Sequence, residues 1–339
     1  MSIGVVTLGE LMMRLKPPAK LRLRQAGYFE ACHGGAEANV AVSLAQFGLS
    51  SRFVSALPPT ELGEQALMSL RASNVDTTHI VRLPGRMGLY FLEEGADVRP
   101  GCVIYDREHT AFCALKADMI DWNLVFEGMT WFHVSGISPA ITPSTRDLTH
   151  EALRQAKARG IHISIDLNHR ERLWQYGQDA TDIMPKLVSL ADTLIAGRGD
   201  CAACLGFSPE GDGSSKDWYE ALSEDAMHRF ENLSRIAITI RNSSSADNHE
   251  WAAHLRTKDD FWFSKTYNFN NVVDRVGTGD AFSAGLIFGL MTNMESSDAL
   301  AFGAAANAMK HTIAGDTNMV TADEVRALIQ SDGTGRLRR

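Results

Sequence analysis

Short, mostly apolar runs alternate with longer segments in which apolar residues recur at helical spacing. This alternation is typical of an α/β protein in which helices flank a mostly parallel central sheet. In such a sheet, ligands bind beyond the carboxyl ends of the strands, so residues just after strands are the first candidates for a site. The strands that we expect are Val5–Leu8, Arg52–Ala56, Trp131–Ile137, Ile161–Leu167, Thr193–Ala196 and Arg235–Ile240.

Two helices have recognisable ends. Thr142 and Pro143 supply an N-cap and a proline at the first helical position, and Gly160 closes that helix. Thr321 and Glu324 form a capping box that opens the last helix. The segment 331–339, which ends in Arg-Leu-Arg-Arg, is expected to be a flexible tail.

Two regions, residues 11–35 and 84–113, interrupt the alternation. They contain short strand-like pieces such as Gly88–Leu92 and Cys102–Asp106, separated by turns, and almost no helical period. We expect them to form a small β-sheet that folds over the main domain as a lid, a dimerisation surface or both. The α/β domain then comprises residues 1–10, 36–83 and 114–330.

Composition narrows the class of protein. With 339 residues, 45% of them hydrophobic, the chain can bury one large core and carry a small appendage. The net charge of -8 and the lack of a basic stripe before the tail argue against a nucleic-acid partner. No apolar stretch is long enough to span a membrane, and the chain begins directly with a strand, so we expect a cytoplasmic protein without a membrane partner.

The five cysteines do not suggest a disulfide framework or a metal cage. Their number is odd, and Cys201 and Cys204 form the one Cys-x-x-Cys pair. A zinc site would need further ligands at matched spacing, which the sequence does not offer. We therefore expect both cysteines on the buried side of a short helix.

The segment Gly277-Thr278-Gly279-Asp280 stands at the start of a strongly apolar helix. A Gly-Thr-Gly turn exposes backbone N–H groups, and the helix adds its positive dipole end, so the segment suits a phosphate. Asp280 could be an ordinary helix cap or a catalytic group. The helix is apolar all round and hence buried, so its N-terminus must open into protein or into a ligand cleft.

The common nucleotide loops are absent. The sequence has no Walker A motif, no strand-linked Gly-x-Gly-x-x-Gly and no protein-kinase motif set. What remains is an anion hole at Gly277, Thr278 and Gly279, with Asp280 placed to take a proton from a hydroxyl that attacks a γ-phosphoryl group.

Two motifs, His33–Ala41 running to Phe47-Gly48 and Asp274–Gly285, give the chain a family resemblance. It resembles the PfkB or ribokinase-like carbohydrate kinases over nearly its whole length. Shorter segments make it most similar to 2-keto-3-deoxygluconate kinases: Gly9–Leu15, Tyr105–Arg107, Asp166–Trp174 and Lys310–Asp316.

The resemblance implies a ribokinase-like fold, ATP and Mg²⁺ as cofactors with a monovalent cation as a further candidate, and a homo-oligomer formed through the lid. It implies Asp280 as the catalytic base. The substrate contacts that it implies are Gly34, Gly35, Tyr90, Tyr105, Arg107 and Arg170, and the nucleotide contacts are Asn168, Asp200, Thr239, Arg241, Gly277, Gly279 and Asn307.

The chemistry of the arginines separately favours an acidic sugar. Tyr105 and Arg107 are two apart on an expected lid strand and should face the same way, and Arg170 lies just past an expected strand end. Two guanidinium groups that meet in one cleft suit a carboxylate. The alternative for each arginine is an ordinary ion pair.

The chain departs from the family pattern at the nucleotide site. The usual Asn-x-x-Glu corresponds to Gly197-Arg198-Gly199-Asp200, so Asp200 keeps a carboxylate that could act on Mg²⁺ indirectly while the asparagine amide is missing. The polar segment 242–249 replaces a compact glycine turn. Asn307 could contact the nucleotide or be a buried polar cap.

These features predict a kinase that phosphorylates the terminal hydroxyl of 2-keto-3-deoxygluconate. One alternative is a neutral-ketose kinase similar to a fructokinase, which loss of Arg107 should not impair. Another is a catalytically silent sugar-sensing protein, against which the intact Asp280 argues. ATP consumption on a panel of sugars and sugar acids separates the three.

Overall fold

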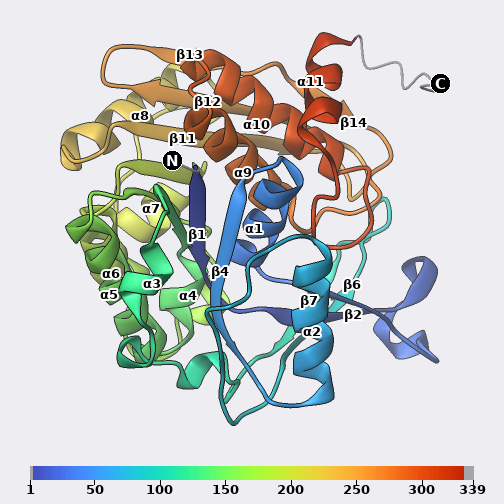
Figure 1. Cartoon of the computed structure of the whole chain (residues 1–339). Helices are drawn as coiled ribbons and strands as arrows, with labels where there is room; N and C mark the ends of the chain where they lie inside the picture. The colour runs from blue at the N-terminus through green and yellow to red at the C-terminus, as the bar shows by residue number, and fades with distance from the viewer. Residues whose placement is uncertain (1–2, 332–339) are drawn as a thin grey trace.

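The computed structural model describes residues 3–331, and within them a ten-stranded sheet forms the centre of the molecule (Figure 1). Its strands follow the order β13-β12-β11-β10-β9-β8-β1-β4-β5, with β14 paired to β12. Neighbours from β11 to β5 run parallel, and β12 is antiparallel to β11. The bounds are β1 Gly4–Leu8, β4 Ser50–Leu57, β5 Ile80–Arg82, β8 Trp131–Ser135, β9 His162–Asp166, β10 Thr193–Gly197, β11 Arg235–Ser243, β12 His249–Thr257, β13 Phe261–Phe263 and β14 Tyr267–Phe269.

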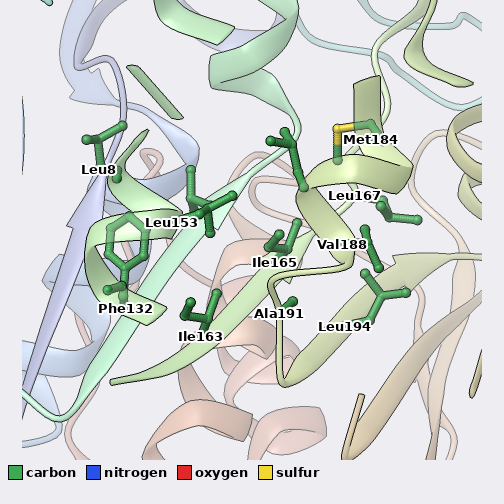
Figure 2. Packing of buried hydrophobic residues seen from close by; sticks show 14 of the residues in the cluster. Leu8, Phe132, Leu153, Ile163, Ile165, Leu167, Met184, Val188, Ala191 and Leu194 are labelled. Atoms are coloured by element: carbon green, nitrogen blue, oxygen red, sulfur yellow. The ribbon is translucent and has the colours of Figure 1, made fainter. Parts of the chain in front are cut away.

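Helices cover both faces of this sheet because successive strand residues point to opposite sides. Val5 packs with α1, α9, α10 and α11, whereas Val6 lies in the core beneath α3, α5, α6 and α8. Figure 2 shows that second core, in which Phe132 and Ile163 of the sheet meet Leu153 of α5. The bounds are α1 Ala36–Gln46, α2 Glu61–Ala72, α3 Trp122–Phe126, α4 Ile137–Ile141, α5 Pro143–Ala158, α6 Ala180–Val188, α7 Asp200–Leu205, α8 Lys216–Arg229, α9 Thr278–Met291, α10 Ser296–Lys310 and α11 Ala322–Gln330.

The predicted fold class is confirmed, and so are the predicted caps. Thr142 forms a capping box at the start of α5 with Pro143 at its first position, and Thr321 caps α11 in the same way. The expected strand Trp131–Ile137 is too long at its end. It stops at Ser135 and α4 begins at Ile137, because the apolar run continues into a buried helix that hydrophobicity alone does not distinguish from a strand.

A separate four-stranded sheet comes from the two segments predicted as the lid. It contains β2 (Met12–Lys16), β3 (Glu30–Gly34), β6 (Gly88–Glu93) and β7 (Cys102–Asp106), in the order β3-β2-β6-β7. Their register places Cys32, Arg14, Tyr90 and Tyr105 side by side across the four strands. Side chains in such a row share one face of the sheet, so chemistry is concentrated on that face.

Other expectations concern the cysteines, the tail and the membrane. Cys201 and Cys204 are both buried on the short helix α7, as predicted, and neither is in a disulfide. Residues 332–339 of the predicted tail lie outside the described residues. No helix within residues 3–331 is long and apolar enough to cross a bilayer.

Candidate active site

A cavity of about 810 Å³ lies where the carboxyl ends of the parallel strands face the small sheet. Asp166, Gly197 and Thr239 line it from the strands β9, β10 and β11. Tyr90 and Tyr105 line it from β6 and β7. This is the edge of an α/β sheet at which ligands bind, so the strand ends and the lid enclose one candidate site.

The predicted anion hole opens into this cavity. Gly277, the N-cap of α9, has φ 78°, and a Cβ at this position would lie 1.9 Å from the backbone oxygen of Asp316. Glycine is therefore required both for the backbone conformation and for the close approach. All of α9 is buried except Gly279, Asp280 and Leu290. The first two line the cavity, so the N-terminus of this buried helix opens into the cleft, which is one of the two alternatives that its apolar sequence allows.

Asp280 lies at this helix end with a pKa raised to about 7. Burial is the main cause, and the nearby carboxylates Glu37 and Asp316 add to it, whereas Arg170 and the hydrogen bond from Asn39 act in the opposite direction. Asn39 Nδ2 donates to Asp280 Oδ2 at 2.7 Å. A carboxylate with a pKa near neutrality is well matched to proton transfer at neutral pH.

Asp166 is a site residue that the sequence analysis did not single out. Burial and the charges of Asp200 and Asp280 raise its pKa to about 8. Its carboxylate accepts hydrogen bonds from Asn168 N at 3.1 Å and Ser283 Oγ at 3.2 Å. Asp166 is the last residue of β9, and this position could have marked it as a site candidate. The expected strand extended to Leu167, so Asp166 was counted as a strand residue.

The two arginines expected to bind a carboxylate have different surroundings. Arg170 is exposed in the cavity and lowers the pKa values of Asp166 and Asp280. Arg107 also lines the cavity, but it is only 6% exposed, and its Nε and Nη2 donate to Glu10 Oε2 at 2.9 and 2.6 Å. Moreover, β7 ends at Asp106, so strand alternation does not orient Arg107 as expected.

The remaining predicted substrate contacts lie on the lid and at the start of α1. Tyr90 is buried, and its hydroxyl donates to Asp316 Oδ2. Tyr105 is partly exposed, with its ring centroid 6.0 Å from that of Tyr90 and the Arg107 guanidinium carbon 5.7 Å from its own ring. Gly34 and Gly35 line the same cavity. The structure thus brings all the predicted substrate contacts to one place.

Most of the predicted nucleotide contacts line the same cavity. Asn168, Asp200, Thr239 and Arg241 line it, and Asp200 Oδ2 accepts a hydrogen bond from Gly197 N at 2.6 Å. Further lining residues that the sequence analysis missed are Arg172, Trp251, Arg275 and Val276.

The structure describes Asn307 and the segment 242–249, whose roles the sequence left open. Asn307 is fully buried behind the anion hole, where its Nδ2 donates to Thr278 O at 2.8 Å, so the polar-cap interpretation describes it and a nucleotide contact does not. Helix packing of α10 on α9 turns its side chain toward the loop. Residues 242–249 form the end of a β11–β12 hairpin whose Asp247 pairs with Lys20 of the lid segment at 2.7 Å.

Comparison with known proteins agrees with this architecture. The model of the pfkB family of carbohydrate kinases matches residues 2–322. The chain belongs to this family. As a PfkB protein it is an ATP-using carbohydrate kinase.

Relatives over the full length carry related names. The chain is 32% identical to a 2-dehydro-3-deoxygalactonokinase of Haloferax volcanii, with 99% of each chain covered, and 26% identical to a 2-dehydro-3-deoxygluconokinase of Bacillus subtilis, with 98% of each covered. A solved structure of 2-dehydro-3-deoxygluconokinase from Thermotoga maritima has TM-score 0.93 and 38% identity, covering 97% of this PfkB chain and 100% of that one.

Proposed function

We propose that the protein transfers the γ-phosphoryl group of ATP to the terminal hydroxyl of a 2-keto-3-deoxy sugar acid, with 2-keto-3-deoxygluconate as the first candidate. The observation that carries the proposal is the position of Asp280 beside the Gly277–Gly279 backbone in the cavity that also contains Arg170. The names of the full-length relatives support the substrate class.

Asp280 acts in this proposal as the general base. Its hydrogen bond from Asn39 fixes the carboxylate, and its raised pKa lets it accept a proton from the sugar hydroxyl. The backbone N–H groups at Gly277–Gly279, with the positive end of α9, stabilise the charge that develops on the transferred phosphoryl group. The protein contributes positioning and electrostatics, which is most of what phosphoryl transfer requires.

The carboxylates of the cavity fit a magnesium ion. Asp166 and Asp200 offer the hard oxygen ligands that Mg²⁺ prefers, directly or through water. The raised pKa of Asp166 is caused by burial and by neighbouring carboxylates, so a divalent cation would relieve an uncompensated negative charge there. When bound, Mg²⁺ supplies charge neutralisation to the β- and γ-phosphate oxygens.

Arg170 is the primary partner for the substrate carboxylate in this proposal. Its guanidinium is exposed in the cavity, whereas that of Arg107 is shared with Glu10. Charge-assisted hydrogen bonds from Arg170 would distinguish a sugar acid from a neutral ketose.

A panel assay of ADP release tests the proposal. The substrates are 2-keto-3-deoxygluconate, its galactonate counterpart, fructose and ribose, each with wild-type protein and with Asp280→Asn. We expect one of the two keto-deoxy acids to have the highest kcat/KM and the variant to lose that activity. Equal kcat/KM for fructose would favour the neutral-ketose alternative instead.

We also propose that two copies associate through the lid. Apolar side chains of the lid segments are exposed, among them Tyr28 at 64% and Ile104 at 50%. Tyr28 lies just before β3 and Ile104 lies within β7, and exposed apolar patches are typical of an interface. Light scattering on the wild type should give a dimer mass, and a Tyr28→Asp, Ile104→Asp variant should give a monomer. A monomeric wild type would contradict the proposal.

A further inference from the structure

Two buried carboxylates stand directly behind the anion hole. Asp274 and Asp316 are 4% and 3% exposed. Asp274 shapes the loop, since its Oδ1 accepts from Val276 N and its Oδ2 from Gly315 N, each at 3.0 Å. Asp316 meets the loop through its backbone oxygen at Gly277. The pair therefore holds the loop in shape but places negative charge beside the proposed phosphate site.

Arg14 supplies the first compensating charge. It reaches from β2 of the lid, and its Nη2 lies 2.7 Å from Asp274 Oδ2 while its Nη1 lies 2.9 Å from Asp316 Oδ1. Arg14 is itself only 3% exposed. One guanidinium between two carboxylates leaves this buried group with one excess negative charge, which is costly where water is excluded.

Lys310 is the second cation, and the chemistry described so far does not use it. It ends α10, is completely buried, and its Nζ donates to Ile313 O at 2.9 Å. Burial lowers its pKa, Arg14 acts in the same direction, and Asp274, Asp316 and Asp280 act against both. Lysine is almost never fully buried unless it is compensated. Val273 N donates to His311 O at 2.9 Å and Gly315 N to Asp274 Oδ2 at 3.0 Å, so the segment that follows Lys310 runs beside Asp274. Asp274 and Asp316 therefore compensate the buried ammonium through their nearby charges, without a direct ion pair to it.

We infer that Lys310 is a positioning residue whose buried ammonium, together with the Arg14 guanidinium, balances the charges of Asp274 and Asp316. The anion hole then needs no bound monovalent cation. The buried group then contains two positively charged and two negatively charged side chains. A further cation among them would create a buried excess of positive charge. The monovalent cation that the family resemblance suggested as a candidate therefore does not fit behind this loop. The inference rests on the proposed role of the loop as the phosphate site.

The consequence is a specific exchange of one cation for another. Removal of the Lys310 side chain leaves a space beside two carboxylates and an excess negative charge that repels phosphate. A small cation from solution can enter such a space and restore the balance. Loss of Lys310 should therefore convert a protein that is indifferent to monovalent cations into one that depends on them.

The test uses the full chain in tetramethylammonium chloride, a cation too large to enter, and in potassium, sodium or ammonium chloride at the same ionic strength. The Kd for ATP by calorimetry and kcat/KM with the sugar acid are measured for the wild type, Lys310→Ala and Lys157→Ala. Lys157 is the matched control, because it pairs with Asp192 on the surface of α5.

We expect wild-type and Lys157→Ala values to agree within about twofold across the four salts. For Lys310→Ala in tetramethylammonium we expect roughly tenfold weaker ATP binding or more, with a substantial part regained in potassium or ammonium. Severalfold activation of the wild type by potassium would overturn the inference, and so would a Lys310→Ala protein that binds ATP normally in every salt.

Two further readouts keep the outcome interpretable. If Lys310→Ala does not fold, the thermal midpoint of the wild type decides, since a protein without a cation site should melt at the same temperature in all four salts. If no sugar acid is turned over, the proposed substrate is wrong, but ATP affinity still reports on Lys310. Failure of the proposed function and failure of this inference are therefore distinguishable.

Discussion

The two ends of the cavity are held in different ways. At the main-domain end, Asp280 sits on a buried helix and is fixed by Asn39, and the loop before it is shaped by backbone hydrogen bonds to Asp274. At the lid end, the polar side chains hold one another through ion pairs such as Arg107 with Glu10. Catalytic geometry is thus built into the scaffold, whereas the lid side of the cavity is held by charged side chains such as Arg107, and recognition of the substrate carboxylate in our proposal depends on the exposed Arg170.

Loss of the base should give the largest effect. Asp280→Asn is nearly isosteric and removes only the proton acceptor, so kcat should fall roughly 10²- to 10⁴-fold while ATP binding changes little. In the wild type, kcat should rise with pH as Asp280 loses its proton near its pKa of about 7, and the variant should lack this limb. Steady-state kinetics across pH provides the measurement. Near-normal turnover would make Asp280 a helix cap rather than a base.

Breaking the ion pair between Arg107 of the lid and Glu10 of the main domain should mainly affect stability. Arg107→Ala leaves Glu10 buried without its partner, which should cost about 3–5 kcal/mol in the free energy of unfolding. Glu10→Gln in the same background removes the orphan charge and should recover part of the loss. The control is Arg86→Ala, because Arg86 pairs with Asp106 on the exposed side of the lid and should behave like the wild type. Urea unfolding measures all four proteins; unchanged stability in Arg107→Ala would mean that this guanidinium is free to serve the substrate.

Removal of Arg170 should affect recognition and leave stability intact. Arg170→Ala should raise KM for a sugar acid roughly 10- to 150-fold, which corresponds to about 1.5–3 kcal/mol, the usual contribution of a hydrogen bond to a charged group. Activity on neutral ketoses should change less, so the ratio of the two KM values is the quantity to measure. An equal loss on both substrate types would rule out Arg170 as the carboxylate partner and leave it as a residue that contributes only positive charge to the cleft.

The same comparison explains which parts of the fold and of the site could be predicted from the sequence. Strands and the caps at Thr142 and Thr321 depend on neighbouring residues, and so does the Gly277 turn, so local patterns identify them. The pair of Arg107 with Glu10 joins residues 97 positions apart, and no local pattern encodes it. Asp166 shows the intermediate case: its strand was predicted, but its role depends on Asp200 and Asp280, which only the fold brings close.

The smallest effect should be a change in amide hydrogen exchange at the lid, because two of its strands contact buried carboxylates of the main domain. Arg14 and Tyr90 contact the buried carboxylates Asp274 and Asp316, so β2 and β6 should exchange slowly in every sample. By contrast, β7 is an edge strand with mostly exposed residues. Lid closure over a substrate would therefore add protection within residues 84–113, chiefly in β7.

Hydrogen exchange measured by mass spectrometry tests this gating. The apo protein is compared with samples holding a sugar acid, a non-hydrolysable ATP analogue, or both, and α8 serves as a control segment remote from the lid. We expect added protection in β7 when the sugar acid is present and little from nucleotide alone, because Tyr105 of β7 lines the cavity and is one of the proposed substrate contacts. Unchanged exchange in β7 would show that the lid is a static surface. The main-domain side and the lid side of the cavity would then differ in the charges that hold them, and the lid would not move on binding.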